Sequence, residues 1–122
     1  MIGDHPLTGV GMDNFLYYYR SRYVLPSAWG ELDLSHPHNL ILDAWTRLGI
    51  GGVVVMAWLC IVFFRSVWGQ LRTALADRRA LLLGLLASMV AVLAHGMVDH
   101  AVFLIDLSFI FALLLAMGNP RQ

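Results

Sequence analysis

The fold is decided by the stretch GIGGVVVMAWLCIVFFRSVW, residues 49–68, in which apolar side chains follow one another almost without interruption. A helix needs roughly 20 predominantly apolar residues to cross the hydrocarbon core of a bilayer. We therefore predict a membrane-spanning helix over residues 49–68. The composition agrees, because 59% of the 122 residues are hydrophobic and only 13% are charged, which is too apolar for a soluble domain of this size.

Two further apolar runs follow, over residues 80–98 and 104–117, with Asp99 and His100 between them. The three runs predict an all-α, helical integral membrane protein, in which an external loop with short helices precedes three transmembrane helices. Arginines surround the connector between the first two runs: Arg65, Arg72, Arg78 and Arg79. The positive-inside rule places this connector and the C-terminus in the cytoplasm, and the N-terminal loop and the Asp99-His100 turn outside.

The sequence before the first apolar run falls into two parts. Residues 1–36 are mixed polar and aromatic and are punctuated by glycine and proline, which predicts an extracytoplasmic loop with short helical pieces. Residues 37–48 have an amphipathic pattern, which predicts a helix at the membrane interface. Its polar face carries Asn39, Asp43 and Arg47, and its apolar face carries Leu42, Trp45 and Leu48.

His38 is the candidate general base of this chain. We expect Ser35 to be the N-cap of the amphipathic helix, with Pro37 in the first turn, where its missing N–H costs nothing. His38 would then lie in the first turn as well. The positive end of the helix dipole disfavours an imidazolium, so the neutral ring would keep a lone pair available for a proton.

The spacing around His38 resembles a known signature. His38-Asn39, followed after nine residues by Gly49-x-x-Gly52, is similar to the signature of the O-antigen ligase and O-antigen polymerase superfamily. Residues 5–15 and 35–42 also resemble the large external loop of that family. Its members are GT-C type membrane glycosyltransferases with more spans than this chain has. We therefore expect the chain to be the C-terminal part of a longer protein.

The resemblance implies an activity outside the bacterial cytoplasmic (inner) membrane, in lipopolysaccharide or polysaccharide biosynthesis. A glycan would move from an undecaprenyl-diphosphate carrier to a hydroxyl on a glycan, lipid or protein acceptor, with His38 as the base. Arg20 and Arg22 would hold the diphosphate, because guanidinium groups bind phosphate oxygens bidentately. Further substrate-binding candidates are Asn39, Asp99 and His100. The resemblance implies no metal ion and no cofactor.

The sequence leaves other functions open. The chain could be a small, non-catalytic membrane scaffold or partner subunit, or a metal or proton transport module that uses His95, Asp99 and His100. His36 and His38, with His5, could bind zinc, but the sequence shows no third and fourth ligand at a recognised spacing. The formal net charge of +0 indicates no nucleic-acid partner.

Overall fold

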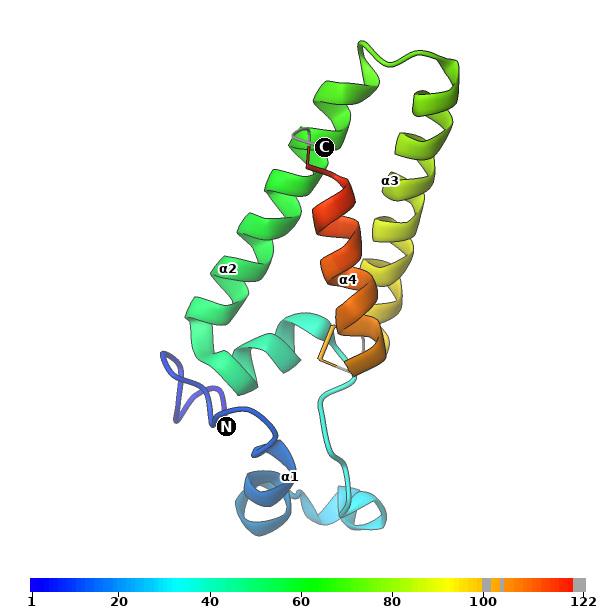
Figure 1. Ribbon diagram of the computed structural model, residues 1–122. Coiled ribbons are helices and arrows are strands. Elements are labelled where there is room, and N and C mark those ends of the chain that lie inside the picture. The colour runs from blue at the N-terminus through cyan, green and yellow to red at the C-terminus, as the bar shows by residue number, and fades with distance from the viewer. Residues whose placement is uncertain (100–101, 104, 120–122) are drawn as a thin grey trace.

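The computed structural model describes residues 1–99, 102–103 and 105–119, and this part of the chain contains helices but no strand. The short helical elements of the N-terminal part are α1 (Phe15–Tyr18), the π-helical turn η1 (Tyr19–Tyr23) and the 3-10 helix η2 (Pro26–Glu31). The long helices are α2 (Leu40–Leu71), α3 (Ala76–Gly96) and α4 (Ile105–Met117). The predicted all-α class is thus confirmed (Figure 1).

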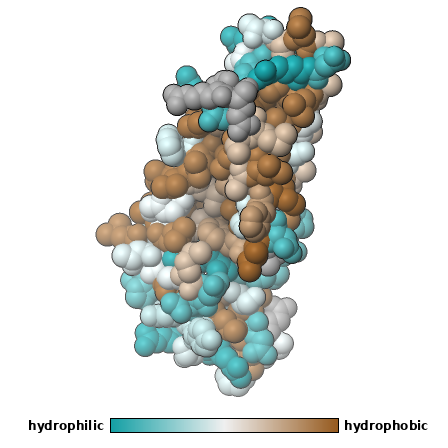
Figure 2. Space-filling model, viewed as in Figure 1, coloured by the Kyte–Doolittle hydropathy of each residue, from teal (hydrophilic) through white to brown (hydrophobic). Residues whose placement is uncertain are grey.

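The chain is a helical membrane protein. α2 with 32 residues and α3 with 21 residues are long and apolar enough to cross a bilayer. Figure 2 shows hydrophobic residues over the helical part of the molecule, between a more polar N-terminal end and a polar cap at the opposite end. α4 has 13 residues, a length of about 20 Å, whereas the hydrocarbon core is about 30 Å thick. The described residues therefore contain two candidate spans and a shorter apolar helix, and the third predicted span stays a prediction.

α2 breaks at Gly49, whose φ of 70° and ψ of −168° are not helical. Residues 40–48 consequently lie across the end of the bundle, and residues 50–71 run along it (Figure 1). The N-terminal loop packs into this break. The N–H groups of Val10 and Gly11 donate to the carbonyls of Thr46 and Arg47 at 2.7 and 3.1 Å. These carbonyls end the first helical segment, so the loop supplies the donors that the broken helix lacks.

The first segment of α2 turns its polar face inward. Asp43 and Arg47 are only 1% and 5% exposed, whereas Leu42 and Leu48 are exposed. Arg47 donates through Nε to Asp43 at 2.7 Å and through Nη1 to Asp13 of the loop at 2.6 Å. The loop thus covers the polar face, and the apolar face is left for a nonpolar environment.

α4 returns between α2 and α3 (Figure 1). The core that joins the three helices consists of Phe63, Val67, Leu82, Leu85, Met89, Phe111 and Leu114. The carbonyl of Gly118, just after α4, accepts hydrogen bonds from the side chains of Ser66 and Gln70 on α2. A Cβ at Gly118 would come within 2.7 Å of the Phe63 ring, so this close approach requires glycine.

Candidate functional site

The start of α2 differs from the prediction, because the N-cap is Asn39 and not Ser35. Asn39 has an extended backbone, and its Oδ1 accepts from the N–H groups of Ile41 and Leu42 at 3.0 and 3.1 Å. Asparagine is among the preferred N-cap residues for this reason. The helix therefore begins at Leu40, and His38 precedes the cap instead of lying in the first turn.

His38 is paired with a carboxylate from the other end of the sequence. Its Nδ1 lies 3.0 Å from Oδ1 of Asp99, which follows α3 and is 61 residues away. An ionised carboxylate only accepts hydrogen bonds, so we assign the proton to Nδ1. Nε2 of the neutral ring then carries the lone pair. The His38 and Asp99 side chains are 54% and 52% exposed, so the pair is accessible from outside the protein.

The ends of α2 and α3 are held together beside this pair. Nδ2 of Asn39 lies 3.5 Å from the carbonyl oxygen of Met97, a long hydrogen bond. The N–H of Asp99 donates to the carbonyl of His95 at 3.0 Å and extends the helical path of α3 by a turn. Asn39 and Asp99, two of the predicted substrate-binding residues, are thus brought to His38. His100, another predicted substrate-binding residue, lies outside the described residues.

His36 lies beside His38 and Asp99, and the three residues form one cluster. Its Nε2 lies 3.8 Å from Oδ1 of Asp99, and its ring centroid lies 4.9 Å from that of His38 in an edge-to-face arrangement. Ser35 does not cap the helix and instead places its Oγ 2.9 Å from Nδ1 of His36. The sequence showed no third zinc ligand near these two histidines. In the structure, Asp99 lies close enough to both to be that ligand. No local spacing could have indicated it.

Arg20 and Arg22 make their described contacts within the N-terminal loop. Arg20 lies 3.4 Å from Asp33 in an exposed ion pair. The guanidinium of Arg22 lies over the Tyr18 ring, 5.6 Å from its centroid. Neither contact brings these arginines to His38. His5, the other histidine considered for zinc, packs its ring edge-on against Tyr18 at 5.8 Å.

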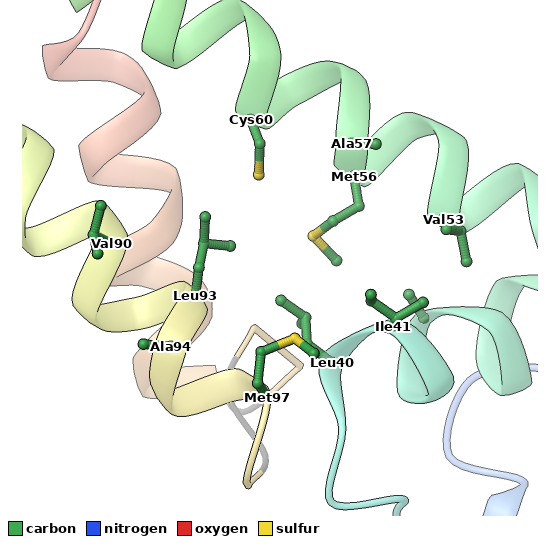
Figure 3. A pocket seen from close by; sticks show the side chains of 11 residues that line it. Leu40, Ile41, Val53, Met56, Ala57, Cys60, Val90, Leu93, Ala94 and Met97 are labelled. Carbon is green, nitrogen blue, oxygen red and sulfur yellow. The ribbon is translucent and has the colours of Figure 1, made fainter.

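An apolar cavity of about 450 Å³ opens between α2 and α3 (Figure 3). Its lining includes Leu40, Ile41, Met56, Cys60, Leu93 and Met97. Leu40 directly follows Asn39, and Met97 is the residue whose carbonyl faces Asn39. The ionisable pair therefore borders a site suited to a hydrocarbon chain.

Comparison with known proteins supports the interpretation of the sequence. Residues 1–57 match the family model described as O-antigen ligase. No curated protein and no solved structure matches the chain. The matched segment contains both histidines of the cluster and the glycine at which α2 breaks. Residues 1–57 of this membrane protein are O-antigen ligase-like, which confirms the resemblance predicted from the sequence.

Proposed function

We propose that this chain carries the base of a membrane glycosyltransferase of the O-antigen ligase type. The enzyme transfers a glycan from an undecaprenyl-diphosphate carrier to a hydroxyl acceptor. The observation that carries the proposal is the 3.0 Å pair between His38 and Asp99, because His38 lies within the matched segment. A histidine oriented by a carboxylate is a recurrent arrangement for taking a proton from a hydroxyl group.

In the proposed reaction, Nε2 of His38 takes the proton of the acceptor hydroxyl as its oxygen attacks the anomeric carbon. The bond between that carbon and the diphosphate oxygen breaks, and the diphosphate leaves on the carrier with the electron pair. Asp99 accepts the Nδ1–H of His38 and stabilises the imidazolium that forms. Asn39 holds the two helix ends so that Asp99 stays against the ring. His100 stays a substrate-binding candidate from the sequence in this proposal.

Arg20 and Arg22 are the proposed partners of the diphosphate. The ion pair of Arg20 with Asp33 joins two side chains that are mostly exposed. Exposed pairs contribute only about 0–1 kcal/mol, so Arg20 can exchange Asp33 for a phosphate at little cost. The apolar cavity between α2 and α3 offers space for a lipid chain beside the reacting groups.

We place the reaction on the outer face of the cytoplasmic membrane. His38 and Asp99 lie at one end of the α2–α3 pair, whereas Arg72, Arg78 and Arg79 lie around the connector at the opposite end. Arginine-rich connectors favour the cytoplasmic side. The loop of residues 1–36 then lies outside, and the C-terminus lies inside.

The test is His38→Ala introduced into the native gene, so that the protein containing this chain carries the change in its own membrane. We expect glycan transfer to fall about 10²- to 10⁴-fold, the usual contribution of a general base. The amount of protein in the membrane fraction should stay the same. Asp99→Asn should also lower the transfer rate while leaving the imidazole in place. Transfer at the wild-type rate in His38→Ala would exclude His38 as the base.

A further inference from the structure

We propose that His36, His38 and Asp99 form a binding site for a divalent transition-metal ion such as Zn²⁺, and that the bound ion blocks His38. The binding site stands on its own geometry. Its inhibitory effect rests on the proposed function, because it requires His38 to be the base.

The ligand atoms are already close to the geometry that a metal ion needs. One nitrogen from each histidine and one carboxylate oxygen of Asp99 all lie within 4.8 Å of one another. Bonds of 2.0–2.1 Å in a tetrahedral zinc site separate neighbouring ligand atoms by about 3.3 Å. The observed distances to Asp99 are 3.0 Å from His38 and 3.8 Å from His36. Shifts of about half an ångström at Asp99, and an approach of up to about 1.5 Å between the two histidine nitrogens, would therefore admit the ion.

The surroundings orient one of the ligands. Ser35 contacts Nδ1 of His36, which directs Nε2 of that ring toward Asp99. A hydrogen-bond partner on the second ring nitrogen is the usual feature of metal-binding histidines. Pro37 lies between the two histidines and restricts their backbone. Three protein ligands leave a fourth position for water, as in open zinc sites.

The donor set selects the class of metal. Two imidazole nitrogens and one carboxylate oxygen suit Zn²⁺, Co²⁺ or Ni²⁺. Ca²⁺ and Mg²⁺ prefer ligand shells made of oxygen. We therefore expect the site to bind Zn²⁺ and Co²⁺ in an excess of Mg²⁺.

Metal binding and proton acceptance are mutually exclusive at His38. In the pair with Asp99, the single proton of the neutral ring is on Nδ1 and the lone pair is on Nε2. A metal ion at Nδ1 takes the lone pair of that nitrogen, and the ring proton moves to Nε2. Nε2 then donates and cannot accept a proton from a hydroxyl group. The ion thus inhibits transfer by fixing the other tautomer.

The binding test uses the 122-residue chain without a histidine tag in detergent micelles, titrated with Zn²⁺ by calorimetry and with Co²⁺ by absorbance. We expect saturable binding that weakens at least about tenfold in His36→Gln and in Asp99→Asn. His5→Gln is the matched control, because the His5 ring packs against Tyr18 instead. Circular dichroism verifies that each variant keeps its helices. Equal affinity in His36→Gln and the wild type, or no saturable binding to the helical wild-type chain, would overturn the site.

The inhibition test compares glycan transfer in membranes with and without added Zn²⁺. Wild-type transfer should fall with Zn²⁺ and recover with a chelator, whereas the transfer that His36→Gln retains should resist Zn²⁺. The two proposals fail separately. If the wild-type chain binds the metal and His38→Ala transfers at the wild-type rate, the proposed function and the blocking mechanism both fail, but the metal site stands. If His38→Ala loses transfer and the wild-type chain binds no metal, only the metal site and its inhibition fail. Equal inhibition of His36→Gln and the wild type would overturn the blocking mechanism.

Discussion

Single residues decide the geometry at both ends of the N-terminal loop. Asn39 caps α2 and also reaches toward Met97, so one side chain starts the helix and ties it to the end of α3. Near the N-terminus, the Tyr23 hydroxyl donates to the carboxylate of Asp4. This hydrogen bond joins the first residues of the loop to the end of η1. Both contacts connect segments that are distant in sequence.

The hydrogen bond between Tyr23 and Asp4 should make the stability of the loop depend on pH. The hydrogen bond from Tyr23 lowers the pKa of Asp4, and the same bond raises the pKa of Tyr23. Its stabilising effect is therefore lost as pH falls through the lowered Asp4 pKa, and as pH rises through the raised Tyr23 pKa. The effect is fully present between about pH 4 and about pH 10, the ordinary values of the two groups.

Tyr23→Phe tests this linkage. The pKa of the Asp4 carboxyl, followed by NMR titration, should rise in the variant because its main hydrogen-bond donor is gone. An ultraviolet absorbance titration should lose a phenol component that ionises above the ordinary tyrosine range. An Asp4 pKa that is the same in both proteins would contradict the assignment.

The element that shapes the site is the broken helix α2. Because of the break, residues 40–48 run across the end of the bundle, and the rest of α2 runs along it (Figure 1). The loop around Leu7 lies directly against Gly49, and the N–H of Ile50 donates to the carbonyl of Pro6 at 3.0 Å. A β-carbon at Gly49 would overlap the carbonyl group of Leu7. Glycine is therefore required by both the positive φ and the packing.

Gly49→Ala and Gly51→Ala form a matched pair for this break. Gly49→Ala should destabilise the protein by more than about 1–2 kcal/mol, since the left-handed backbone alone costs an L-residue that much. A β-carbon at Gly51 would meet no atom of another packed segment within 4 Å in the described part of the chain, and alanine is the better helix former by about 1 kcal/mol. Gly51→Ala should therefore be neutral or stabilising in thermal unfolding. Equal unfolding temperatures for the two variants would argue against the required break.

Across the whole molecule, the loop and the membrane helices are joined through Arg47. Its guanidinium is almost fully buried, bridges Asp43 of α2 to Asp13 of the loop, and lies over the Phe103 ring at 5.2 Å. Phe103 lies between α3 and α4, so the same group contacts three regions of the chain. This arrangement holds Phe103 against the end of the first segment of α2.

Arg47→Ala should cost about 3–5 kcal/mol of stability, because it breaks the buried ion pair with Asp43. Arg20→Ala removes an exposed ion pair of the same type and should change stability by less than about 1 kcal/mol. Thermal unfolding of both variants in detergent micelles compares the two costs. Similar small losses in both would show that the Arg47 bridge is not a structural link.

The sequence predicted much of the fold and only part of the site. Long apolar runs indicated α2 and α3, and the run over 104–117 contains the shorter apolar helix α4. The i,i+4 spacing correctly grouped Asp43 with Arg47. The same spacing did not show that this face is buried, because periodicity says which residues share a face and not what covers it.

The sequence by itself determined the helical, membrane-embedded character and the O-antigen ligase-like segment, because hydropathy and short motifs are properties of neighbouring residues. Only the tertiary structure decided that Asp99 faces His36 and His38. That contact spans 61 residues from His38 and depends on the direction of α2 after Gly49, on the return of α3, and on the packing between their ends. Distances between such remote residues are set by helix packing, which no local pattern records.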